Sequence, residues 1–140
     1  LATSTPDLLL RATEAQAAFR YAPEKWSVKQ VVGHLCDVER VFGYRALRIA
    51  RADATPLPGF DEDAWAANAG SDARDMGDLV AEYRALRAST LALFASFDEA
   101  AYARRGTANG HPISVRALAH VIAGHERAHV AMLHERYGLV

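Results

Sequence analysis

The sequence contains a single cysteine, Cys36, among 140 residues. One cysteine cannot form a disulfide within the chain, so a reducing cytoplasm is the expected location. The longest apolar runs are far shorter than the roughly 20 residues that a membrane-spanning helix needs. The opening stretch, LATSTPDLLL, lacks the basic region and the apolar core of a signal peptide. These absences predict a cytoplasmic protein that does not act in a membrane.

Charge of one sign is also missing, because the formal net charge is −1 at pH 7. This balance gives no electrostatic reason to expect nucleic acid or an anionic membrane as a partner. Hydrophobic residues make up 51% of the chain, which is ordinary for a packed core. The length fits one domain. We therefore predict a single domain over residues 1–140.

Four segments carry the pattern of long helices. Ser27 is a natural N-cap, and Gln30 three residues later is its capping-box partner. Ser114 can cap the last segment, and Gly138 can end it. The predicted helices run from Pro6 to about Ala22, from Val28 to about Arg51, from about Asp75 to about Phe97 and from Val115 to Tyr137.

The connections between these segments carry shorter signals. A short helix is expected over 61–69 and a turn of helix over 98–103, and the Asn109-Gly110 pair is typical of a hairpin or a tight turn. Sustained β-alternation is absent elsewhere. The predicted fold class is therefore all-α, a four-helix bundle with a short extra helix or turn in the connections.

The last predicted helix contains the letters H-E-x-x-H, which zinc peptidases use with the Glu as general base. The motif spans His125, Glu126 and His129. Its extended form also needs Gly at position 132 and His at 135, where this chain has Met132 and Glu135. The fold also offers no edge strand to hold an extended peptide. The peptidase interpretation therefore fails, and a third ligand must come from upstream.

Helical geometry places three histidines on inward-facing stripes. On the last helix, His125 and His129 interrupt a seam that is otherwise apolar. On the second helix, His34 shares a stripe with Val38 and Arg45. Three buried imidazoles in one small core are costly unless something unites them, and a divalent metal does so while keeping positions open for water or substrate.

The alternative is that these histidines are hydrogen-bonded core residues, which is the commoner role of a lone histidine facing a core. His34 strengthens the metal interpretation only if the second and last helices are neighbours. The sequence alone does not show that they are.

Three stretches together resemble the DinB-like superfamily, the group that includes the YfiT-type proteins. They are WSVKQVVGHLCDVERVFGYRALRIA, TPLPGFDEDAW and RRGTANGHPISVRALAHVIAGHERAHVAML. The resemblance covers nearly the whole chain. It implies a four-helix bundle, commonly a homodimer, with zinc, nickel or a similar divalent ion held by three histidines. Position by position these are His34, His125 and His129, the set that the helical stripes select.

Two carboxylates are candidate catalytic residues. Asp37 lies one turn beyond His34 and could orient a ligand or accept a proton, or it could form a surface ion pair. Glu126 could act as a base, or it could be solvated or interfacial. Arg45 could bind a substrate carboxylate or form a structural ion pair. Cys36 points away from His34 and is expected to pack in the core.

The sequence favours a metal-dependent enzyme acting on a small molecule. A bound ion would act as a Lewis acid that activates water or a thiol. Relatives of the DinB-like type include thiol-S-transferases that use low-molecular-weight thiols and proposed hydrolases, and the sequence does not choose between these reactions. The alternative is a non-catalytic metal-binding module for stress response or interaction. A sealed site or a fourth protein ligand would favour that module.

Overall fold

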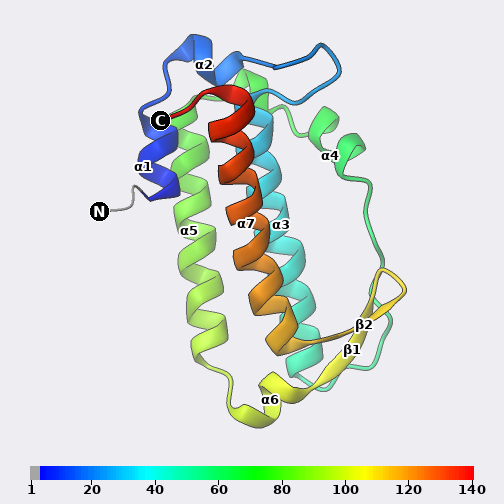
Figure 1. Cartoon of the computed structure of the whole chain (residues 1–140). Helices are drawn as coiled ribbons and strands as arrows, with labels where there is room; N and C mark the ends of the chain where they lie inside the picture. The colour runs from blue at the N-terminus through cyan, green and yellow to red at the C-terminus, as the bar shows by residue number, and fades with distance from the viewer. Residues whose placement is uncertain (1–3) are drawn as a thin grey trace.

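The computed structural model describes residues 4–140 and contains three long helices that lie side by side. These are α3 (Val28–Ala50), α5 (Met76–Ala95) and α7 (Val115–Tyr137). α3 packs against both α5 and α7. A short helix, α1 (Thr5–Leu10), lies beside one end of α5 and takes the fourth position of the bundle (Figure 1). The predicted fold class, an all-α four-helix bundle, is confirmed.

At Ser27, Ser114 and Gly138 the predicted helix ends are confirmed because the caps are formed. Ser27 accepts a hydrogen bond from the backbone N–H of Gln30, whose side chain in turn accepts from the Ser27 N–H. Ser114 caps α7 through the N–H of Ala117. Gly138 ends α7 in the left-handed conformation, with φ of 67°. Each cap satisfies backbone groups that a helix end leaves without partners.

The predicted first helix is not continuous. It breaks after Leu10, and a second short helix, α2 (Glu14–Ala18), begins after Thr13. Thr13 forms a capping box with Gln16, which starts a new helix in the middle of the predicted one. The prediction of one helix that reaches Ala22 is therefore wrong in length and in continuity.

The connection between α3 and α5 carries α4 (Glu62–Asn68) and a 3₁₀ turn, η1 (Ser71–Ala73). After α5 come α6 (Glu99–Ala103) and an antiparallel hairpin of β1 (Arg105–Ala108) and β2 (His111–Ser114). Asn109 and Gly110 form the hairpin turn, with φ of 51° and 75°. The predictions of a short helix, a turn of helix and a hairpin at these places are confirmed.

The core has two large apolar clusters, one toward each end of the bundle. The first joins α1, α3, α5 and the end of α7, around Leu9, Val32 and Leu133. The second joins the end of α3 to α5, α6 and the start of α7, around Ile49 and Leu118. His34 on α3 and His125 and His129 on α7 lie between these clusters. Two packed ends therefore hold the central parts of these helices in place.

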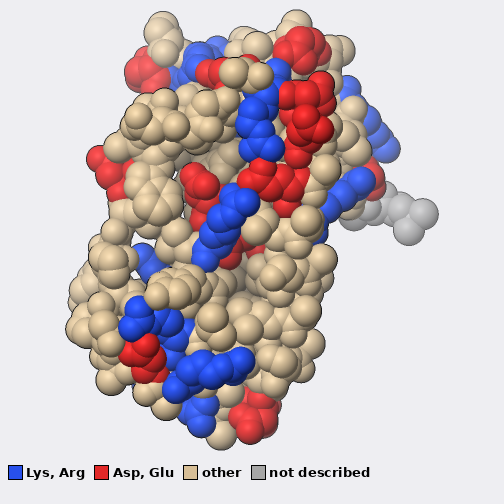
Figure 2. Space-filling model, turned by 180° about the vertical axis from the view of Figure 1, so that it is seen from behind, with Lys and Arg blue, Asp and Glu red and all other residues tan. Residues whose placement is uncertain are grey.

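Charged side chains of both signs are mixed on the face opposite that of Figure 1. Figure 2 shows lysine and arginine beside aspartate and glutamate over the upper half of that face. Among residues 4–140, no helix is long and apolar enough to cross a membrane.

Candidate metal site

Three histidine side chains converge between α3 and α7. The Nε2 atom of His34 lies 2.9 Å from Nε2 of His125, and Nε2 of His129 lies 3.1 Å from the same atom. One ring nitrogen from each residue falls within 4.8 Å of the others. The second and last predicted helices are therefore neighbours, the point that the sequence left open. The structure brings together all three histidines of the predicted set.

Hydrogen bonds between the three rings cannot satisfy all of their Nε2 atoms well. A neutral imidazole carries one N–H and one lone pair. The Nε2 atom of His125 is either a donor or an acceptor, so it makes a good hydrogen bond with only one of its two neighbours. In addition, the Nδ1 atom of His129 is buried and has no hydrogen-bond partner among the described residues. A divalent cation, by contrast, would accept a lone pair from each Nε2.

The spacing of the nitrogens also suits a single ion. Imidazole nitrogens at about 2.0–2.1 Å from zinc lie about 2.9 Å apart at right angles and about 3.4 Å apart in a tetrahedron. The two Nε2 separations of 2.9 and 3.1 Å fall within this range. These two separations are compatible with a single divalent ion held by the three histidines.

The three imidazoles are neutral near pH 7. Burial is the main reason that the pKa of each is lowered from 6.5 to about 4, and the neighbouring rings lower it further. His34 is the most enclosed, at 4% exposed. Metal binding requires the unprotonated ring, so the environment holds these residues in the form that binds a cation.

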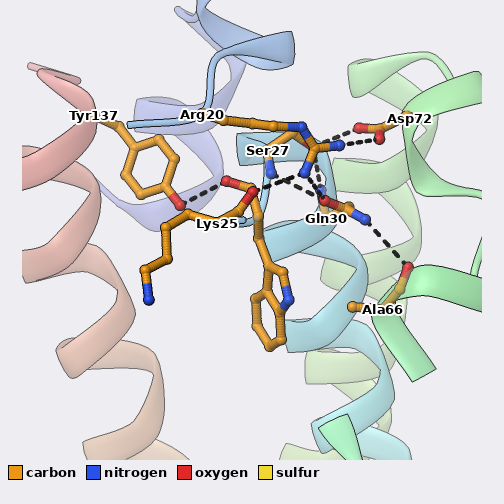
Figure 3. A network of polar contacts seen from close by, with 8 residues as sticks. Arg20, Lys25, Ser27, Gln30, Ala66, Asp72 and Tyr137 are labelled. Atoms are coloured by element: carbon orange, nitrogen blue, oxygen red, sulfur yellow. Dashed lines mark hydrogen bonds and ion pairs between the residues drawn. The ribbon is translucent and has the colours of Figure 1, made fainter. Parts of the chain in front are cut away.

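Trp26 forms a wall of the site. Its ring centroid lies 4.7 Å from that of His34, and it is stacked on His129 at 6.5 Å with 13° between the planes. The Tyr137 hydroxyl on α7 donates to the Trp26 carbonyl at 2.8 Å. This bond holds the segment before α3 against the end of α7 (Figure 3).

A polar network fixes the same segment from its other side. Arg20 donates to the Gln30 side chain and to Asp72, each at 2.6 Å, and to the Lys25 carbonyl at 2.8 Å. Figure 3 shows Arg20, Gln30 and Asp72 meeting beside the first turn of α3. The Ser27 hydroxyl also donates to Asp72. Trp26, which lies between Lys25 and Ser27, is therefore anchored through its neighbours in the chain.

Two cavities reach the histidines. One, of about 200 Å³, is lined by His34, His125 and Arg45 together with apolar side chains. The other, of about 640 Å³, is lined by His129 and Trp26. Glu62, on α4, lines both. The site is open on two sides.

Among the ion pairs of residues 4–140, the one that includes a histidine of the site is formed with Glu62. Its Oε2 atom lies 3.9 Å from Nε2 of His34. Our sequence reasoning missed it. The segment Asp61-Glu62-Asp63 reads as the acidic first turn of a short helix, and the Asp61 side chain does cap α4. No periodic pattern could have shown that α4 folds back over α3.

The two carboxylates that the sequence suggested lie elsewhere. Glu126 pairs with Arg87 at 2.6 Å, and this contact helps lower its pKa despite burial. Asp37 is half-buried and lines a different cavity with Trp65 and Arg40. Burial raises its pKa. Neither residue lines the cavities that reach the histidines.

Arg45 and Cys36 are both buried on α3, at 6% and 2% exposed. Cys36 lies in a small apolar cluster with Leu35 and Tyr83, as expected of a packing residue. Burial raises its thiol pKa to about 12. Arg45 lines the smaller cavity, and burial lowers its pKa.

Comparison with known proteins identifies the fold and the family. No curated protein matches the sequence. The structure of YfiT from Bacillus subtilis superimposes with a TM-score of 0.78 at 24% identity, over 96% of this chain and 82% of that one. YfiT is described as "a probable metal-dependent hydrolase with an unusual four-helix bundle topology". The family model of the DinB superfamily matches residues 2–133. The chain therefore belongs to the DinB superfamily.

Proposed function

We propose that this protein is a metal-dependent enzyme acting on a small molecule, of hydrolase or thiol-S-transferase type. A divalent ion, zinc or nickel, would be held by His34, His125 and His129. The observation that carries the proposal is the convergence of three neutral imidazole nitrogens around one point. Such an ion, when bound, supplies a Lewis acid that lowers the pKa of a water or a thiol.

The protein's own groups would divide the remaining work. α3 and α7 hold the imidazoles, and Trp26 covers one side of them and restricts water. The Glu62 carboxylate lies at the meeting point of the two cavities. We propose that its Oε2 atom accepts the proton of the attacking water or thiol, as a general base does. This assignment differs from Asp37 and Glu126, the candidates that the sequence suggested.

The openness of the site favours an enzyme over a structural metal module. Structural zinc sites are closed by four protein ligands, whereas catalytic sites keep a position open. Among the described residues, the group able to hold a metal consists of three histidines, and cavities reach it from two directions. The description of YfiT as "a probable metal-dependent hydrolase" agrees with this choice.

Metal content tests the proposal. Protein purified without an affinity tag should bind about one zinc or nickel ion per chain, measured by mass spectrometry. His34→Ala and His129→Ala should each lose the metal while circular dichroism shows the fold retained. His120→Ala is the matched control, because His120 is exposed on α7 and outside the site. Wild-type protein that takes up no metal on reconstitution would refute the proposal.

Activity assays would then separate the two reaction types. The metal-loaded protein is screened with small esters and amides, and separately with electrophilic acceptors plus a low-molecular-weight thiol. Turnover that needs the thiol identifies a transferase, and turnover in water alone identifies a hydrolase. Metal binding without either activity would favour the non-catalytic module.

We also propose that the protein is a homodimer, which membership of this superfamily suggests. Support comes from a groove of about 840 Å³ between α5 and α7, lined by Leu91, Val130 and Ala131. Leu91 lines this groove and is 63% exposed. Sedimentation analysis should show a dimer that Leu91→Asp weakens. Leu10→Asp, a change at an exposed leucine outside the groove, should not weaken it.

A further inference from the structure

Arg45 differs from the buried Lys29 and Glu39 because it has no ion-pair partner among residues 4–140. The buried Lys29 is paired with Glu14 at 2.6 Å, and the buried Glu39 is paired with Arg87. Arg45 is 6% exposed, yet no carboxylate of residues 4–140 forms an ion pair with it. A buried guanidinium without a counter-ion is costly, so a structural ion pair does not explain this residue.

The protein contacts of the Arg45 guanidinium use only part of its capacity. Nη2 donates to the Pro58 carbonyl at 2.8 Å, and the guanidinium carbon lies 5.1 Å from the centroid of the Phe42 ring. A guanidinium has five N–H donors arranged as a planar fork. The Pro58 carbonyl and the Phe42 ring orient the group and leave most of the fork for a ligand.

The same cavity joins Arg45 to the histidines. Its lining includes His34, His125 and Glu62 as well as Arg45, and Val38, Phe42 and Phe60 supply apolar walls. Side chains on a helix lean toward its N-terminus, so Arg45 leans along α3 in the direction of His34. The volume of about 200 Å³ equals that of roughly six or seven waters in the liquid. A small molecule bound in this cavity would lie close to both Arg45 and the histidines.

We infer that Arg45 binds the carboxylate of the substrate, so that the substrate is a small monocarboxylate whose reacting group lies beside the three histidines. This inference rests on the proposed function for the reaction, although carboxylate binding can be tested without it. A carboxylate matches the guanidinium fork with two parallel hydrogen bonds. The cavity presents one arginine and no lysine, and Glu62 adds a negative charge, so a carboxylate with a single charge suits it better than a phosphate dianion does.

Butyrate is a suitable probe because it is a small monocarboxylate, and butyramide is its neutral match. The protein, both metal-free and zinc-loaded, is titrated with each while nuclear magnetic resonance follows the Arg45 Nε–H signal and calorimetry gives the affinity. We expect butyrate to shift that signal in a saturable manner. Arg45→Met and butyramide should each weaken binding at least about tenfold, as loss of a charged hydrogen-bond pair does.

Two further variants control for folding and for charge. Arg45→Lys keeps the charge but not the fork, and it should also bind butyrate more weakly than wild type. Arg51→Met removes an exposed arginine outside the cavity and should bind like wild type. Circular dichroism checks that each variant is folded.

The outcomes separate this inference from the proposed function. Butyrate binding that depends on Arg45 supports the inference, even if no metal binds and the enzyme proposal fails. Zinc binding at the histidines combined with an Arg45 signal that does not move up to high butyrate concentration overturns the inference alone. Binding that Arg45→Met leaves unchanged, for example directly on the zinc, overturns it as well.

Discussion

Acid should destabilise the metal-free protein through its three neutral histidines. The pKa of each ring is about 4 in the folded chain and about 6.5 when the chain unfolds. Because the folded pKa is the lower one, the unfolded state takes up protons first as pH falls. The stabilisation is therefore complete above about pH 6.5 and is lost as pH falls from about 6.5 through 4.

The magnitude follows from the size of the shift. A difference of about 2.5 pKa units corresponds to about 3.4 kcal/mol for one histidine over the full range. Between pH 7 and pH 5 one such residue loses about 1.8 kcal/mol, and three independent residues would lose about 5.5 kcal/mol. The rings are in contact, so the total should lie between these two values. It is a large part of the ordinary stability of about 5–15 kcal/mol.

Urea denaturation in the presence of a chelator, at pH values from 7 to 5, measures this effect. Acidic residues titrate as well, so the comparison is with a triple variant in which His34, His125 and His129 are each replaced by glutamine. The free energy of unfolding of wild type should fall at least about 1.8 kcal/mol more than that of the variant between pH 7 and 5. Equal pH dependence in the two proteins would refute the reasoning.

Three other predictions concern single side chains. Arg87→Met should lower the free energy of unfolding, measured with urea, by about 3–5 kcal/mol because it leaves Glu39 buried without its partner. Arg84→Met, at an exposed ion pair, should lower it by less than about 1 kcal/mol. A loss below about 1 kcal/mol for Arg87→Met would contradict the prediction. Cys36 should resist a thiol-specific disulfide reagent at neutral pH until the chain is unfolded, because its pKa is raised to about 12, and rapid native-state labelling would show otherwise. Glu62→Gln should keep the metal and lower turnover by about 10²–10⁴-fold, as loss of a general base does. The same change at Glu135, which is exposed on α7 and lines neither cavity, should alter turnover little. Loss of metal in Glu62→Gln would make Glu62 a ligand instead.

Much of the fold could be predicted because its signals are local. Ser27, Ser114 and Gly138 act through hydrogen bonds to residues close in the chain, and the structure forms each of them. The first helix was mispredicted for a related reason. Thr13 and Gln16 also form a local capping box, but they lie within an apolar pattern that suggested continuity. The capping signal outweighed the periodic one.

The candidate site was predictable only in part. The histidines could be found because helical periodicity shows which residues share a face, and the packing of α3 against α7 brings the two faces together. The partner of a buried charge could not be predicted in this way: Glu39 on α3 pairs with Arg87 on α5. Such a choice depends on how helices pack, which a single sequence does not encode in a readable pattern.

Glu62 could not be predicted from helical periodicity because it belongs to a connection and not to a long helix. The histidines are held by two long helices, but Glu62 and Phe60 reach the site from the connection between α3 and α5. Long helices packed at both ends are rigid, whereas connections vary more readily without loss of the core. The three histidines are thus fixed by the bundle, and the residues proposed to contact a substrate are set partly by the connection. Differences in substrate between proteins that share the three histidines should therefore arise in this connection and at Arg45.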